Sequence, residues 1–119
     1  MTYRPVVGAV MSEVEAYRKA FAEYQEARDR VREIVGIVRD VADLLKEPQR
    51  FQFKNAPSHR SNPGTPVSNI DASSWPTAGD IQNAISVWDS SFNAMQAAWQ
   101  RIPPPERIAL QSPPSVMKL

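Results

Sequence analysis

The apolar residues of the first 47 positions recur at alternating steps of four and three. This is the spacing of a helix face that packs on another helix. A second row starts after residue 31 and widens the apolar stripe, so we expect the C-terminal half of this helix to be packed from two directions and the N-terminal half from one. The first row is Val10, Val14, Tyr17, Phe21, Tyr24, Val31, Val35, Val38, Ala42 and Leu45, and the second is Ile34, Ile37, Val41 and Leu44.

Both ends of this first helix carry recognisable signals. Ser12 and Glu15 match a capping box, in which a hydroxyl and a carboxylate satisfy free amides of the first turn. Pro48 cannot continue a helix. The pattern therefore predicts a helix over about residues 13–46. Arg28 interrupts the row, either as a polar residue that fixes the register or as an arginine whose stem lies on apolar surface.

A second, uninterrupted row covers residues 81–102. Thr77 is the expected N-cap, Asp80 suits the positive first turn, and the prolines from Pro103 on end the helix, which predicts a helix over about residues 78–101. Two matching rows favour an all-α helical hairpin that forms a single domain over residues 1–119. Antiparallel pairing is expected, although the long connection also permits parallel pairing. The row is Ile81, Ile85, Trp88, Phe92, Met95, Trp99 and Ile102, beside small residues at Ala84, Val87, Ser91, Ala94 and Ala98.

The remaining face of the second helix is polar but almost uncharged. It carries Gln82, Asn93, Gln96 and Gln100, and Asp89 is its one charged residue before Arg101. Amides find hydrogen-bond partners where charges are costly to desolvate, and interface cores are depleted in charge in the same way. We therefore predict that this face touches another chain or the folded-back connection. The alternative is a solvent-facing helix of unusual composition.

Residues 47–77 form a long connection rich in proline, serine and asparagine, which we expect to be ordered by packing on its own helices or on another chain. Phe51 and Phe53 alternate with polar residues, which indicates a strand that adds to a partner's sheet or an extended segment whose rings dock on the helices. With their basic neighbours they also form a candidate nucleic-acid contact. This candidate set is Arg50, Phe51, Phe53, Lys54 and Arg60.

The ends of the expected hairpin offer two more surfaces. If the second helix pairs with the first from the connection end, it leaves about ten residues of the first helix uncovered. Val14, Tyr17 and Phe21 lie there, and they are predicted to bind a partner. The proline-rich tail, residues 102–119, is predicted to contain a short helical turn after Pro105 and to dock through Ile108 and Leu110.

Composition narrows the function classes. The chain has no cysteine, one histidine and no glycine-rich phosphate loop, so we expect no catalytic residues, no metal site and no cofactor. Fourteen basic against thirteen acidic residues give no net charge that implies a polyelectrolyte partner. The longest apolar run is about five residues against roughly 20 for a membrane helix, and residues 1–8 lack a long apolar secretion signal. A soluble, cytoplasmic protein without membrane insertion is expected.

These features favour a non-catalytic structural or assembly subunit, which associates with itself or packs into a larger complex such as a virion, a phage particle or a secretion machine. One alternative is a small helical nucleic-acid adaptor that uses the basic and aromatic connection. Another is a regulator or chaperone that clamps one partner helix. No motif in the chain is specific enough to indicate a known family.

Overall fold

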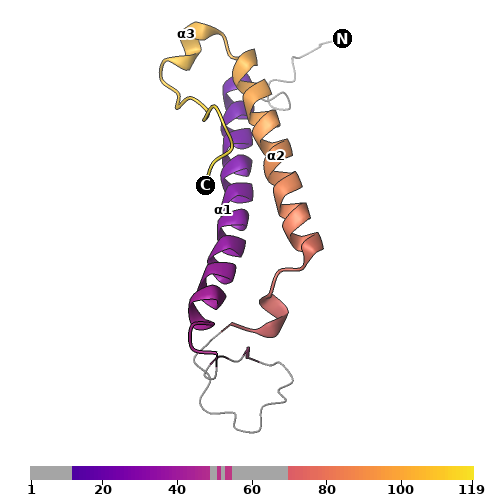
Figure 1. The fold of residues 1–119 in the computed structure, drawn as a ribbon. Coiled ribbons are helices and arrows are strands. Elements are labelled where there is room, and N and C mark those ends of the chain that lie inside the picture. The colour runs from indigo at the N-terminus through magenta and orange to yellow at the C-terminus, as the bar shows by residue number, and fades with distance from the viewer. Residues whose placement is uncertain (1–11, 49–50, 52, 55–69) are drawn as a thin grey trace. The chain divides into compact units, whose positions relative to one another are not determined.

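The computed structural model describes residues 12–48, 51, 53–54 and 70–119. The fold is all-α, as predicted, and its two long helices pack against each other as a helical hairpin (Figure 1). In chain order the helices are α1 (Glu13–Leu44), the 3₁₀ helix η1 (Ala72–Ser74), α2 (Ala78–Arg101) and α3 (Pro104–Arg107). Among the described residues, no helix combines the length and the hydropathy that a membrane span requires.

Capping side chains fix where the two long helices begin. The Ser12 hydroxyl accepts a hydrogen bond from the amide of Glu15 at 3.1 Å. At the start of α2 the box is reciprocal: the Asp80 amide donates to the Thr77 hydroxyl and the Thr77 amide donates to the Asp80 carboxylate, both at 3.0 Å. These bonds lower the pKa of Asp80, the backbone bond from Thr77 most of all. The predicted N-caps of both helices are confirmed.

The end of α1 lies two residues before the predicted one. The amides of Lys46 and Glu47 donate to the carbonyls of Asp43 and Leu44, at 3.2 and 3.1 Å. These bonds span three residues where a helix spans four, so the backbone tightens into a turn before Pro48. The spacing of apolar residues continues to Leu45, although the helix itself ends at Leu44.

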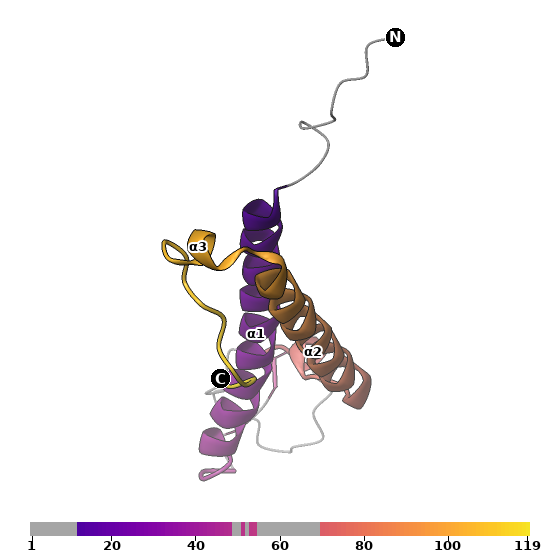
Figure 2. The same cartoon turned by 90° about the horizontal axis from the view of Figure 1, so that it is seen from above.

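The chain divides into two compact units, which are described separately. The first combines Met1–Asp29 with Ile85–Leu119. Here Tyr17 contacts Trp99, with ring centroids 5.0 Å apart, and Tyr24 contacts Phe92 at 6.0 Å. Seven residues forward on α1, from Tyr17 to Tyr24, correspond to seven residues back on α2, from Trp99 to Phe92. The two helices therefore run antiparallel. After α2 the chain turns back, and α3 and the tail lie next to the N-terminal part of α1 (Figure 2).

The core of the first unit is shifted on α2 from the predicted row toward the adjacent row of small residues. Trp88, Met95 and Ile102 of the predicted row are buried, but Phe92 and Trp99 are half-buried and Ile85 is 42% exposed. The contact is centred instead between the large row and the small row, where a small side chain lets the two backbones approach. The buried residues of this unit are Tyr17, Tyr24, Ala27, Trp88, Met95, Ala98 and Ile102.

The second unit is Arg30–Ala84, and its buried residues among those described are Ile34, Val41, Pro76 and Ala84. Of the two alternatives for the stretch around Phe53, a strand or an extended segment, the described residues show a single parallel bridge between Lys54 and Asp71 and no strand. In this bridge the Lys54 amide donates to the Ile70 carbonyl and the Ala72 amide donates to the Lys54 carbonyl, both at 2.9 Å. The bridge closes the connection on itself. That both units together form one domain stays a prediction.

Candidate functional site

The N-terminal third of α1 is not the uncovered surface that the sequence suggested. Tyr17 is 2% exposed, because the last turns of α2 and the tail cover it, while Val14 and Phe21 are half-buried. The expectation assumed that α2 pairs with α1 from the connection end. Instead Trp99, near the end of α2, lies against Tyr17. The premise was therefore wrong, and a partner contact at these three residues stays an untested prediction.

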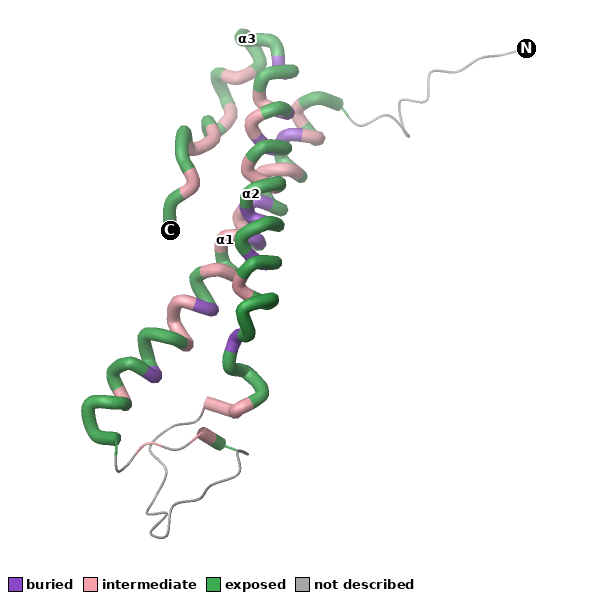
Figure 3. Tube along the Cα trace, turned by 45° about the vertical axis from the view of Figure 1, so that its right-hand side comes forward, coloured by how far each residue is buried: buried purple, intermediate pink, exposed green. Residues whose placement is uncertain are grey.

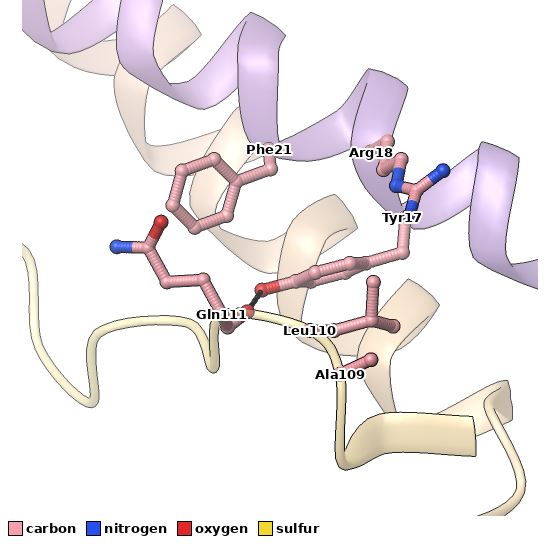
Figure 4. A pocket seen from close by; sticks show the side chains of 6 residues that line it. All are labelled: Tyr17, Arg18, Phe21, Ala109, Leu110 and Gln111. Carbon is pink, nitrogen blue, oxygen red and sulfur yellow. Dashed lines mark hydrogen bonds between the residues drawn. The ribbon is translucent and has the colours of Figure 1, made fainter.

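Side chains of both long helices hold the C-terminal tail by its backbone. The Tyr17 hydroxyl donates a hydrogen bond to the Gln111 carbonyl at 2.6 Å (Figure 4), and the Gln96 amide donates to the Pro114 carbonyl at the same distance. Docking of the tail agrees with the prediction, but its side chains do not behave as expected. Leu110 is half-buried, whereas Ile108 is 87% exposed.

Arg107 closes the turn that leads from α2 into the tail. Its Nε donates to the Ile102 carbonyl at 2.9 Å and its Nη2 to the Gln100 carbonyl at 3.3 Å. Its guanidinium also lies over the Trp99 ring, 5.3 Å from the centroid. Cations near a helix C-terminus satisfy the last carbonyls and interact favourably with the helix dipole. Arg107 therefore caps the last carbonyls of α2 and joins the tail to the end of that helix, a role that no spacing in the sequence indicated.

A small hollow of about 240 Å³ lies between α1 and the tail (Figure 4). Burial raises the pKa of the Tyr17 hydroxyl on its wall to about 12, so this group is a neutral donor at physiological pH. Ligand pockets usually start near 300 Å³. The hollow is therefore packing space under the tail. Its lining residues are Tyr17, Arg18, Phe21, Ala109, Leu110 and Gln111.

The neutral face of α2 is covered in part, and by the tail. Gln96 is half-buried and bonded to Pro114, and the carbonyl of Gln100 accepts from Arg107. Gln82, Asn93 and Gln100 are exposed. The predicted partner of this face was the connection or another chain, whereas Gln96 binds the tail. Contacts of Gln82, Asn93, Gln96 and Gln100 with another chain stay a prediction.

The candidate nucleic-acid residues are only partly described, since Arg50 and Arg60 lie outside the described residues. The Phe51 and Phe53 rings meet edge to face at 4.9 Å, and Phe53 meets Trp75 in the same way at 5.7 Å. Both phenylalanines are half-buried, and Lys54 is exposed. The rings therefore pack on their own chain, and a contact with nucleic acid stays untested.

The C-terminal half of α1 carries an open apolar groove of about 350 Å³. Ile34 and Val41, from the second apolar row, are 6% exposed, whereas Val38 from the first row is 41% exposed and Leu45, just past the helix, is 51% exposed. Figure 3 shows exposed and half-buried residues around the two buried positions in this part of α1. The groove is lined by Ile34, Val35, Val38, Arg39 and Ala42.

The signal for this groove was present in the sequence. The stripe of α1 doubles in width after Val31, which indicated packing from two directions. The second row is the more covered one, with Ile34 and Val41 buried and Ile37 and Leu44 half-buried, whereas the first row is exposed from Val38 on. The chain therefore covers the side of α1 that carries the second row. The side that carries the first row is open and has the spacing on which a helix packs.

The described residues offer little chemistry beyond packing. Within them no group of three or more histidine, cysteine, aspartate or glutamate side chains is placed to hold a metal ion. No protein-family model matches the chain, and comparisons with curated proteins and with solved structures find no similar protein. The open groove on α1 is therefore the strongest candidate for a functional surface.

Proposed function

We propose that this protein is a non-catalytic assembly subunit, and that it binds another protein through the open apolar groove on the C-terminal half of α1. The observation that carries the proposal is the exposure of Val38 and Leu45 beside half-buried Val35 on one row. Apolar residues exposed side by side mark interaction sites more often than single ones do. On the sequence grounds given above, we place this activity in the cytoplasm.

The spacing of the row supports a helix as the bound element. Val31, Val35, Val38, Ala42 and Leu45 keep the alternating steps of a coiled-coil seam. The same kind of row, in the N-terminal half of α1, already packs on α2. A seam of this kind accepts side chains of a neighbouring helix between its own, so the groove suits a partner helix better than a flat surface.

The test is affinity purification of the full chain from its native host, followed by reconstitution of the complex from purified components. Val38→Asp places a charge in the groove and is expected to abolish the reconstituted complex. Ile108→Asp is the matched control, because Ile108 is a more exposed aliphatic residue outside the groove. Equal complex formation by both variants, or the absence of any complex, would contradict the proposal.

The stoichiometry of that complex separates the proposed function from its nearest alternative. An assembly subunit is expected in several copies per particle, measured by light scattering coupled to gel filtration. A fixed complex of one copy with one partner would instead indicate a regulator or chaperone. Thermal melting of Val38→Asp alone should match the wild-type protein within about 0.5 kcal/mol, since the side chain is exposed.

A further inference from the structure

A row of basic residues borders the apolar groove on one side. Arg32, Arg39 and Lys46 are spaced seven residues apart, and all three are exposed. At 100° per residue Arg32 and Arg39 lie beside Val35 and Ala42, on the side away from the buried Ile34 and Val41. Arg39 lines the groove itself. The groove therefore has a cationic edge of Arg32 and Arg39, seven residues or about 10 Å apart along the helix axis, and Lys46 follows in the turn after α1 ends at Leu44.

The three cations of this edge are exposed, although Arg32 and Lys46 both have interactions within the chain. Lys46 pairs with Asp43 at 3.4 Å, but both side chains are more than 60% exposed. Exposed ion pairs contribute little free energy and exchange readily. In a coiled coil the residues next to the seam face the flanking residues of the partner, and opposite charges there select the partner and its orientation. We therefore expect the groove to prefer a partner helix that carries acidic residues along one flank.

A second copy of this chain fits the groove poorly. Two antiparallel copies would place the row of Arg32, Arg39 and Lys46 against the same row, and like charges that face each other are destabilising. Two parallel copies would place that row against the side of Ile34 and Val41, which is buried within the chain. Charge and burial thus both disfavour self-association through this groove.

An anionic membrane surface also fits poorly. Helices that lie on membranes combine an apolar face with a polar face rich in lysine and arginine. Here the polar face beyond the three cations is acidic, and residues 31–47 hold four acidic side chains against three basic ones. These acidic residues are Glu33, Asp40, Asp43 and Glu47. A lipid surface would therefore meet both signs of charge.

We propose that the occupant of the groove is an amphipathic helix of another protein, with its apolar row flanked by glutamate or aspartate. The inference rests on the proposed function and adds the chemistry of the partner. The apolar row of that helix packs on Val35, Val38 and Ala42, and its acidic flank faces Arg32, Arg39 and Lys46. The apolar contact supplies most of the affinity, and the charges supply the selection.

The experiment uses the full chain and two labelled four-heptad peptides as probes, with leucine and isoleucine in the seam. One peptide carries glutamate at every flanking position and the other carries lysine. In fluorescence anisotropy titrations we expect the glutamate peptide to bind about tenfold more tightly, because several flanking contacts change from repulsive to attractive. Arg39→Glu is expected to reduce the ratio between the dissociation constants of the two peptides by at least about threefold. Arg18→Glu, an equal charge change at an exposed arginine in the other half of α1, is expected to leave the preference unchanged.

Four outcomes overturn the inference. Equal binding of the two peptides would show that charge does not select the partner, and binding of neither would show that the groove takes no such helix. Tighter binding of the chain to phosphatidylserine vesicles than to either peptide would assign the groove to a membrane. A dimer that Val38→Asp dissociates would assign the groove to a second copy. If the peptides bind equally and Val38→Asp still abolishes the complex from the host, only the acidic flank is wrong. If Val38→Asp leaves that complex intact, the proposed function fails as well.

Discussion

The two halves of α1 carry the same spacing of apolar residues and meet different surroundings. In the N-terminal half the row is aromatic, and Tyr17 and Tyr24 are both 2% exposed against α2 and the tail. In the C-terminal half the same row consists of valine, alanine and leucine, and Val38 is 41% exposed. A heptad row therefore predicts that a helix face packs on another helix. The row does not indicate whether that second helix belongs to the same chain.

The largest difference is expected from shortening one buried and one exposed apolar side chain. Met95 is fully buried against the N-terminal half of α1, so Met95→Ala should lower the free energy of unfolding by about 2–5 kcal/mol. Val38→Ala, in the open groove, should change it by no more than about 0.5 kcal/mol. Chemical denaturation of both variants measures the difference. Similar losses would mean that the two halves of the row are equally covered.

Alkaline titration tests how well Tyr17 is covered. Its pKa is raised from 10.0 to about 12, so the folded state favours the neutral phenol. The contribution of Tyr17 to stability is complete below about pH 10 and is lost as the pH rises through about 12, a loss of roughly 2–3 kcal/mol.

Tyr17→Phe is the control for that titration. The variant lacks the titrating hydroxyl, so the difference between its unfolding free energies at pH 9 and pH 12 should be smaller than that of the wild type by roughly 2 kcal/mol. Parallel pH profiles for the two proteins would show that Tyr17 is not shielded from water by α2 and the tail.

A smaller effect is expected from releasing the tail on the α2 side. Gln96→Ala removes the donor to the Pro114 carbonyl and should cost about 1 kcal/mol, the usual net value of one hydrogen bond. Hydrogen exchange of the tail amides should accelerate in the same variant. Gln82→Ala, at an exposed position of the same helix, should leave both quantities unchanged, and an equal effect of the two substitutions would contradict the docking described for Gln96.

The smallest expected effect is a gain in the open half. Gly36 lies inside α1, and a methyl group added there meets no atom within 4 Å. Gly36→Ala should therefore stabilise the protein by about 0.5–1 kcal/mol, because alanine loses less backbone freedom in a helix. A rise of the melting temperature checks this. A loss of stability would show that another element packs on this side of α1 after all.

The local features of the fold could be predicted from short stretches of sequence. Capping at Ser12 and Thr77 depends on residues three positions apart, and the stop at Pro48 depends on one residue, so neither needs tertiary information. The alternatives left open for Arg28 were also local. Its guanidinium lies 5.9 Å from the centre of the Tyr24 ring and pairs with Asp29 at 3.6 Å, which favours an arginine whose stem lies on apolar surface.

The register of the two helices could not be predicted, and the position of the open groove depends on it. A long connection between two rows permits several alignments that differ by whole heptads, and the apolar spacing is satisfied by each of them. The aromatic pairs Tyr17 with Trp99 and Tyr24 with Phe92 decide the alignment. Large rings fill the space between the helices better than valine does, and this packing preference is invisible in a pattern that counts all apolar residues alike.

The manner in which the tail is held has a consequence for how this sequence can diverge. Tyr17 and Gln96 bind the carbonyl oxygens of Gln111 and Pro114, which every amino acid possesses. The identities of residues 111 and 114 are therefore free to drift so long as the backbone keeps its path. Tyr17 and Gln96 are not free in the same way, since few side chains present a donor at that reach. In diverged relatives, the two helix positions should be constrained and the two tail positions variable.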